Sequence, residues 1–176
     1  MPFQKYDLRI AVTEPVQPHR LDLESYVPFF LIAISNKLTA NSSRVLLREF
    51  DCGVTEWRVL AMLAIEPGIP PGRITSVVGI DKSSVSRALK ILQERGCVVI
   101  DQDPGHRRRQ ILSLTPEGQA LHDRIILRAL ARQELLLTGF AAEERRVLVS
   151  FLKRLLRNVP LVAEAAAAED DSAQEG

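Results

Sequence analysis

The chain has 176 residues, of which 46% are hydrophobic and 26% are charged, and its formal net charge is +1. A chain of this size and composition can bury a hydrophobic core in one folded domain with appendages. No hydrophobic run reaches the roughly 18 residues that a transmembrane helix needs, which excludes a membrane protein. The first residues also lack the charged stretch and hydrophobic core of a secretion signal, so a cytoplasmic location is expected.

The N-terminal part divides into an arm and a long helix. Residues 1–20 contain Pro2, Pro15 and Pro18, too many prolines for a long helix, which predicts an arm that packs on a partner subunit or stays loose. The segment 21–54 follows, with a helix expected over residues 21–50. Its hydrophobic side chains are Phe29, Phe30, Ile34, Leu38, Val45, Leu46 and Phe50.

Two shorter helical segments come next. Residues 56–64 predict a helix with Thr55 as its N-cap and Pro67-Gly68 closing it, because hydrophobic residues recur on one face. A short hydrophobic element around Ile74 then ends at Gly79. A short helix, a turn that contains a glycine and a further helix together predict a helix-turn-helix, whose second helix contacts DNA bases.

The further helix begins after Asp81, a favourable N-cap residue, and ends at Gly96. Hydrophobic side chains recur at the helical spacing that places them on one face. The other face carries hydroxyls and cations, which suit a helix that lies in a major groove. The residues of the hydrophobic face are Val85, Ala88, Leu89 and Leu92, and those of the polar face are Lys82, Ser83, Ser86, Arg87 and Lys90.

A hairpin is predicted directly after this helix. Two short runs rich in β-branched residues, 97–100 and 111–114, are separated by Asp103-Pro104-Gly105, which is typical of a turn. The tip of this wing would carry His106 and the three arginines 107–109. Guanidinium groups on a protruding hairpin can enter a minor groove or pair with phosphates.

The C-terminal part is again helical. Thr115 is predicted as an N-cap, with Pro116 at the first helical position, for a helix that runs to about residue 138. A last helix is expected over residues 142–158, with Pro160 ending it. The remaining segment, 161–176, is alanine-rich and acidic and predicts a disordered tail.

The charge is unevenly distributed along the chain. Residues 161–176 contain five acids and no base, so the chain without them carries +6. Residues 56–115 contain nine bases and six acids. The positive excess therefore coincides with the predicted DNA-binding motif.

These motifs resemble the MarR-type transcriptional regulators, named for multiple antibiotic resistance. The resemblance covers about residues 21–160. It is most specific in the run from Asp81 to Arg87, in Asp103-Pro104 with Arg107-Arg108, and in Leu114-Thr115 with Gly118. The family's wing has an acid where this chain has His106, so Arg108 is expected to lack the carboxylate that braces it in relatives.

The resemblance implies a mainly α, α+β fold: a winged helix-turn-helix over residues 55–115 with a two-stranded wing, and long helices over 21–54 and 116–160 that form a dimerisation region. A two-fold dimer presents two recognition helices one DNA turn apart, which predicts a pseudo-palindromic operator. Because such a protein binds DNA, it is expected to be nucleoid-associated. The residues expected to contact double-stranded DNA are Lys82, Ser83, Ser84, Ser86, Arg87, Lys90, Arg107, Arg108 and Arg109.

The same resemblance implies a small-molecule effector. The tripeptide Glu56-Trp57-Arg58 is similar to one in regulators of aromatic acid catabolism, some of which respond to an acyl-CoA thioester. The protein is therefore expected to be a repressor released by an aromatic acid or its CoA thioester. Aromatic walls and cationic partners for such a ligand are predicted at Tyr26, Phe29, Phe30, Arg44, Trp57, Arg58 and Arg73.

Two other functions stay open. An architectural or adaptor protein could use the same fold to bind DNA without an effector, and a cysteine redox-sensing regulator could use Cys52 or Cys97. The two cysteines are also typical of small buried side chains. The histidines are far apart in the sequence and no glycine-rich phosphate loop follows a strand, so no catalytic residue, metal ligand or cofactor is expected.

Overall fold

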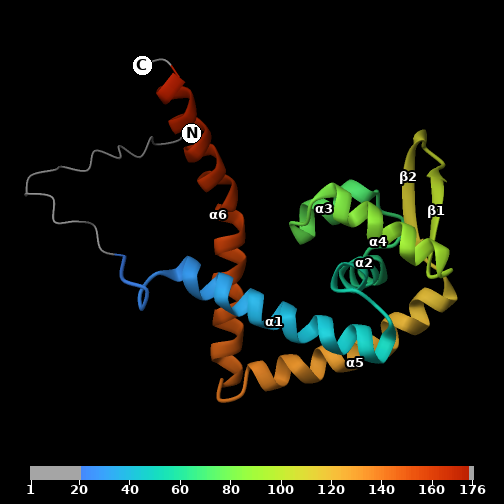
Figure 1. Ribbon diagram of the computed structural model, residues 1–176, viewed down its shortest axis with the longest axis horizontal. Helices are drawn as coiled ribbons and strands as arrows, with labels where there is room; N and C mark the ends of the chain where they lie inside the picture. The colour runs from blue at the N-terminus through green and yellow to red at the C-terminus, as the bar shows by residue number, and fades with distance from the viewer. Residues whose placement is uncertain (1–20, 175–176) are drawn as a thin grey trace, which may run out of the picture. The chain divides into compact units, whose positions relative to one another are not determined.

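The computed structural model describes residues 21–174, and the chain divides between Val54 and Thr55 into two units. The predicted N-terminal arm, residues 1–20, lies outside the described residues. The fold is mainly helical with one two-stranded antiparallel sheet (Figure 1). The elements are α1 Val27–Phe50, α2 Val54–Ile65, α3 Pro71–Val78, α4 Lys82–Glu94, β1 Val98–Asp103, β2 His106–Leu114, α5 Pro116–Leu136 and α6 Ala142–Gln174.

Helix α1 begins at Val27, so the prediction of a helix from residue 21 was wrong for the first six residues. Asp22 explains the difference, because its carboxylate accepts hydrogen bonds from the backbone N–H of Glu24 (3.0 Å) and the hydroxyl of Ser25 (2.7 Å). Such side-chain bonds to nearby groups favour a turn over a helix. The helix ends where Asp51 adopts a left-handed conformation with φ of 48°.

The helix-turn-helix has the predicted order. Helix α2 begins one residue before Thr55, so the prediction of Thr55 as its N-cap was wrong. Helix α3 ends at Gly79, whose φ of 67° is a left-handed conformation that glycine adopts without strain. Helix α4 begins after Asp81, as predicted.

One hydrophobic core joins these elements in the second unit. Helix α3 contacts α4 and β2, α4 contacts β1, and α5 contacts β2. Burying such side chains stabilises each by about 1.5–3 kcal/mol relative to exposure. The core side chains with less than 2% exposure include Val59, Leu60 and Leu63 of α2, Ile74 of α3, Val85 and Leu92 of α4, Leu112 of β2, and Ile125 of α5.

The wing is longer than predicted. Its strands pair from Val98 opposite Leu114 to Asp103 opposite His106, with an irregularity in register next to Asp103. The Asp103 carboxylate accepts the backbone N–H of Gly105 at 2.8 Å, which closes a tight turn at residues 104–105. The arginines 107–109 therefore belong to strand β2, and the prediction that they form the hairpin tip was wrong.

Helix α5 begins as predicted and fits closely against the wing. The Thr115 hydroxyl accepts the backbone N–H of Gly118 at 3.0 Å and donates to the carbonyl of Gly96 at 2.6 Å. A Cβ atom at position 118 would lie 1.9 Å from the carbonyl oxygen of Cys97. Only glycine allows this approach, which anchors the start of α5 at the end of α4 and the start of β1.

Helix α6 continues through Pro160 to Gln174, so the predictions that Pro160 ends the helix and that residues 161–176 are disordered were wrong for residues 161–174. Proline removes one backbone hydrogen bond from a helix interior, yet the alanines that follow it have the highest helix propensity. The helix therefore continues through Pro160 into the alanine run.

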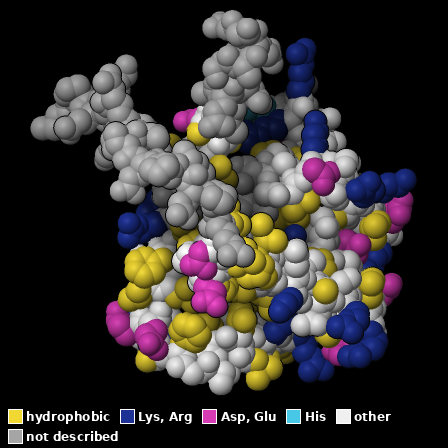
Figure 2. All heavy atoms as spheres, turned by 60° about the vertical axis from the view of Figure 1, so that its left-hand side comes forward, with side chains coloured by type: hydrophobic (Ala, Val, Ile, Leu, Met, Phe, Trp, Pro, Cys, Tyr) yellow, Lys and Arg dark blue, Asp and Glu magenta, His cyan; other side chains and the backbone are white. Residues whose placement is uncertain are grey.

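Several helices carry large hydrophobic side chains at the surface. They include Phe29 and Phe30 of α1, Leu130 of α5, and Phe151, Leu152 and Leu156 of α6. Figure 2 shows hydrophobic side chains, in yellow, at the molecular surface. Such patches are typical of interaction surfaces. Among residues 21–174, no helix is both long and apolar enough to cross a membrane.

Candidate nucleic-acid interface

Helix α4 presents one polar face and one buried face, as its sequence predicts. The side chains of Val85, Ala88, Leu89 and Leu92 are buried in the core. The predicted DNA-binding residues Lys82, Ser83, Ser86, Arg87 and Lys90 are exposed on the same helix. The structure therefore gathers five of the predicted DNA-binding residues on one exposed surface.

The Asp81 carboxylate organises the first turn of this helix. Its Oδ1 atom accepts hydrogen bonds from the backbone N–H of Ser84 at 2.8 Å and from the hydroxyl of Ser83 at 2.5 Å. The bonds from Ser83 and Ser84 hold the pKa of the Asp81 carboxyl well below its usual range. Asp81 is therefore an acceptor of hydrogen bonds, and the sequence predicted its capping role but not its bond to Ser83.

Ser84 has a different environment from the other serines of α4. It is half-buried, and its Oγ accepts a hydrogen bond from Nη2 of Arg87 at 3.1 Å. Its hydroxyl also contributes to lowering the pKa of Asp81. Ser84 thus links Asp81 to Arg87 in one hydrogen-bond network on the first two turns of the helix. This network orients the Arg87 guanidinium.

The wing supplies a second group of cations. Arg108 and Arg109 are exposed on β2, whereas only the backbone of Arg107 is described. The Nε atom of Arg109 lies 4.0 Å from Oδ2 of Asp103, so a carboxylate of the wing does face an arginine. The sequence motif concerned a brace for Arg108, and the pairing of Arg109 with Asp103 was not predicted.

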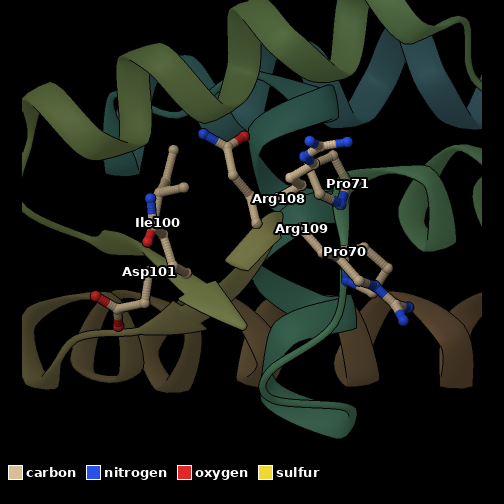
Figure 3. A pocket seen from close by; sticks show the side chains of 8 residues that line it. Pro70, Pro71, Ile100, Asp101, Arg108 and Arg109 are labelled. Atoms are coloured by element: carbon tan, nitrogen blue, oxygen red, sulfur yellow. The ribbon is translucent and has the colours of Figure 1, made fainter. Parts of the chain in front are cut away.

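Two depressions separate the wing from the helices. The first has a volume of about 620 Å³ and lies among α3, α4 and the wing, with Val85, Leu89 and Ile100 beside Lys82 and Lys90. The second has a volume of about 560 Å³. In Figure 3, Arg108 and Arg109 lie near Pro70 and Pro71 at the second depression. Cations thus border both concave surfaces: Lys82 and Lys90 of α4 border the first, and the wing arginines Arg108 and Arg109 border the second.

The predicted ligand residues fall in two groups. Phe29, Phe30 and Arg44 belong to α1 and Tyr26 is its N-cap residue. The rings of Phe29 and Phe30 meet edge to face with centroids 5.6 Å apart. Arg44 donates to the side-chain oxygen of Asn41 at 3.0 Å. This first group belongs to the first unit of the chain.

The second group, Trp57, Arg58 and Arg73, belongs to α2 and α3. The Trp57 ring stacks on His122 of α5, with centroids 5.5 Å apart and planes at 22°. Arg73 makes two hydrogen bonds of 3.0 Å to the carboxylate of Glu66. The sequence predicted neither partner: Trp57 meets a residue of another helix, and Glu66 lies just after the end of α2. Arg73 already has a carboxylate partner within the chain.

Both cysteines are buried. The Cys52 side chain is fully inaccessible and Cys97 is 5% exposed. Their thiols contact the carbonyls of Gly53 and Arg95 respectively. Buried cysteines in such surroundings are typically structural and unreactive. The prediction that they act as small buried side chains is confirmed.

The helix-turn-helix, the two-stranded wing and the flanking helices define a winged helix-turn-helix protein. Residues 51–109 match the model of the MarR family. The matched residues make up about a third of the chain, and the match confirms the resemblance of its sequence motifs to that family.

Individual relatives are similar over more than half of this chain. A transcriptional regulatory protein for the hcr operon of Thauera aromatica is 31% identical over 107 residues, which are 60% of this chain. The chain spans 64% of that relative's length. The crystal structure of a MarR-family regulator from Silicibacter pomeroyi is 29% identical, with a TM-score of 0.72 over 78% of this chain and 92% of that one.

A further solved structure contains a ligand. The PcaV transcriptional regulator of Streptomyces coelicolor, crystallised with its natural ligand, is 25% identical. Its TM-score is 0.65, over 84% of this chain and 98% of that one.

Proposed function

We propose that this protein is a DNA-binding transcriptional regulator that inserts α4 into a major groove and places the wing against the adjacent backbone or minor groove. The exposed polar face of α4, with three cations and two hydroxyls beside the arginines of β2, carries this proposal. Cations neutralise phosphates, and hydroxyls and guanidinium groups contact base edges. The DNA-binding lobe would comprise residues 55–115.

The protein would act as a homodimer on a pseudo-palindromic operator. The hydrophobic side chains exposed on α1, α5 and α6 support association with a second copy, because a monomer would leave them in water. Residues 21–54 and 116–160 would form the dimerisation region. A dimer that occupies an operator next to a promoter would repress transcription.

A small aromatic acid or its CoA thioester would release the repressor. The similarity to a regulator for the hcr operon and to PcaV with its bound ligand supports an effector of low molecular mass. Trp57 provides an aromatic surface and Arg58, also half-buried, a cation on the same helix. A carboxylate or phosphate could pair with such a guanidinium.

The first test is selection of DNA by the full-length protein from a duplex library with about 25 randomised base pairs, enough for two half-sites one turn apart. Enrichment of one palindromic sequence supports the proposal. The absence of any enriched sequence contradicts it.

Ligand dependence is then measured on the enriched duplex. Aromatic acids and their CoA thioesters are screened by thermal shift, since a ligand that prefers the native state raises the melting temperature. Each hit is added to a DNA titration. A regulator requires a changed DNA affinity, whereas an architectural or adaptor protein binds DNA equally with and without the ligand.

A further inference from the structure

The first two turns of α4 contain three serines with different hydrogen-bonding environments. A serine hydroxyl has one proton to donate and two lone pairs to accept, and it normally rotates to suit its partner. A freely rotating hydroxyl therefore discriminates poorly between a donor and an acceptor on a base edge. Selectivity requires that something in the protein holds the proton.

At Ser83 the proton is held. Its Oγ lies 2.5 Å from Oδ1 of Asp81. An ionised carboxylate has no proton to donate, so Ser83 must be the donor in this bond. The same Oδ1 atom accepts the backbone N–H of Ser84 at 2.8 Å, which fixes the carboxylate at the start of the helix. Ser83 itself is exposed, and with its proton bound to Asp81 its oxygen is left to act as an acceptor.

The other two serines differ from Ser83. Ser84 is half-buried, and although its hydroxyl also interacts with the Asp81 carboxylate, its oxygen already accepts a hydrogen bond from Arg87 at 3.1 Å. Ser86 is exposed, but the residue two positions before it is Ser84 instead of an acid. No carboxylate is therefore placed at Ser86 as Asp81 is placed at Ser83. Ser86 is the natural control for Ser83.

We propose that Ser83 determines base specificity as a fixed hydrogen-bond acceptor, and that Asp81 is the positioning residue that holds it so. This inference rests on the proposed DNA-binding function. In the major groove, cytosine offers the N4 amino donor and adenine the N6 amino donor, whereas guanine and thymine offer oxygen acceptors. Ser83 selects an amino group, because an oxygen acceptor there would face its lone pairs.

The experiment uses full-length protein and the enriched duplex from the library selection. The Ser83→Ala variant first identifies the base pair whose preference Ser83 sets. At that base pair the exocyclic amino group is then deleted by using purine for adenine or 2-pyrimidinone for cytosine. Deletion of the amino group should weaken wild-type binding about three- to tenfold more than it weakens Ser83→Ala binding. Both proteins bind the same modified duplex, so the effect of the weaker base pair within the DNA cancels when their losses of affinity are compared.

Two further variants test whether the base preference needs the fixed orientation of the Ser83 hydroxyl or only its presence. In Asp81→Ser the helix keeps a good N-cap, but the new hydroxyl can donate as well as accept, so Ser83 can rotate. The melting temperature should stay near that of the wild type while the specific sensitivity to the amino group disappears. Ser86→Ala should retain that sensitivity in full.

Several outcomes overturn the proposal. Ser83→Ala with an unchanged base preference shows that the hydroxyl contacts no base. Sensitivity of the wild type to deletion of a base oxygen, instead of the amino group, shows that Ser83 donates. Full retention of the amino sensitivity in Asp81→Ser removes the role of Asp81. If the wild type enriches no sequence, the proposed function itself fails, which is a different result from any of these.

Discussion

At the scale of single residues, Arg87 combines exposure with a defined orientation. It lies on the polar face of α4, and its Nη2 atom donates to the Ser84 hydroxyl oxygen at 3.1 Å. A guanidinium that is oriented before binding loses less conformational freedom when it meets a base or phosphate. Its contribution can therefore be specific to sequence.

We expect Arg87→Ala to weaken binding to the enriched duplex by about 1–3 kcal/mol and to relax base preference at one position. Competition titrations of the enriched duplex against random duplex measure both effects. Lys153→Ala, which also removes one positive charge but lies on α6, is the matched control. Equal losses on both duplexes would mean that Arg87 contacts only phosphate.

Gly118 tests the junction between α5 and the wing. Because a Cβ there would approach the carbonyl oxygen of Cys97 to 1.9 Å, Gly118→Ala should lower the free energy of unfolding by about 1–3 kcal/mol. Denaturant titration monitored by circular dichroism measures this. A Cβ at Gly72 of α3 would meet no atom within 4 Å, so Gly72→Ala should change stability by less than about 1 kcal/mol. Similar stabilities for the two variants would contradict the close approach.

At the scale of elements, Arg145 connects the end of α5 to the start of α6. Its Nη2 donates to the carbonyl of Leu137 at 3.1 Å, its Nε to that of Phe140 at 3.3 Å, and its Nη1 contacts the carboxylate of Glu134 at 2.6 Å. One side chain thus contacts two carbonyls of the turn between α5 and α6 and a carboxylate of α5.

We expect Arg145→Ala to lower the free energy of unfolding by about 1–2 kcal/mol at pH 7. The hydrogen bond from Arg145 lowers the pKa of Glu134 below 4.5. The part of the stabilisation that depends on the charge of Glu134 is therefore full above pH 4.5 and is lost as the pH falls through the lowered pKa. The bonds to the two carbonyls do not titrate. The difference between wild type and variant, measured by thermal unfolding across pH, should shrink in acid.

Arg146 provides the control for this prediction. It is exposed and pairs with Glu143 on the same helix, an arrangement that stabilises proteins by about 0–1 kcal/mol. Arg146→Ala should leave the melting temperature almost unchanged. An equal effect of both substitutions would show that general charge loss, and not the junction, is responsible.

At the scale of the whole molecule, the proposed dimer depends on hydrophobic side chains that are exposed within one chain. Leu152 and Leu155 of α6 are 42% and 38% exposed. In contrast, Leu121 and Ile125 of α5 are buried. A truncation after Thr115 would therefore disturb the core as well as the dimer, whereas substitutions on α6 act on association alone.

We expect the double substitution Leu152→Glu and Leu155→Glu to convert a dimer into a folded monomer. Burying two carboxylates in a dimer interface costs far more free energy than leaving them exposed to water on a monomer. Sedimentation at micromolar concentration measures assembly, and circular dichroism checks folding. Lys153→Glu, on the polar side of α6, should remain dimeric. A wild-type chain that sediments as a monomer would refute the proposed assembly.

The sequence by itself determined the features that depend on neighbouring residues. Asp81 and Thr115 were predicted as N-caps, and Gly79 and Gly96 as helix ends, because capping bonds and left-handed glycines act within a few residues. The division of α4 into a buried and a polar face followed from helical periodicity. These local rules were enough to predict the winged helix-turn-helix and five exposed candidates for DNA contact.

Only the tertiary structure decided how residues distant in sequence meet. The stacking of Trp57 on His122 and the close approach of Gly118 to Cys97 are two such contacts. The wing strands pair as far as Asp103 and His106, so the wing arginines lie in β2. Helix α6 continues through Pro160 because helix propensity in the surrounding residues outweighs one lost hydrogen bond. Such outcomes depend on geometry and on sums of small free energies over many residues, which local sequence rules do not contain.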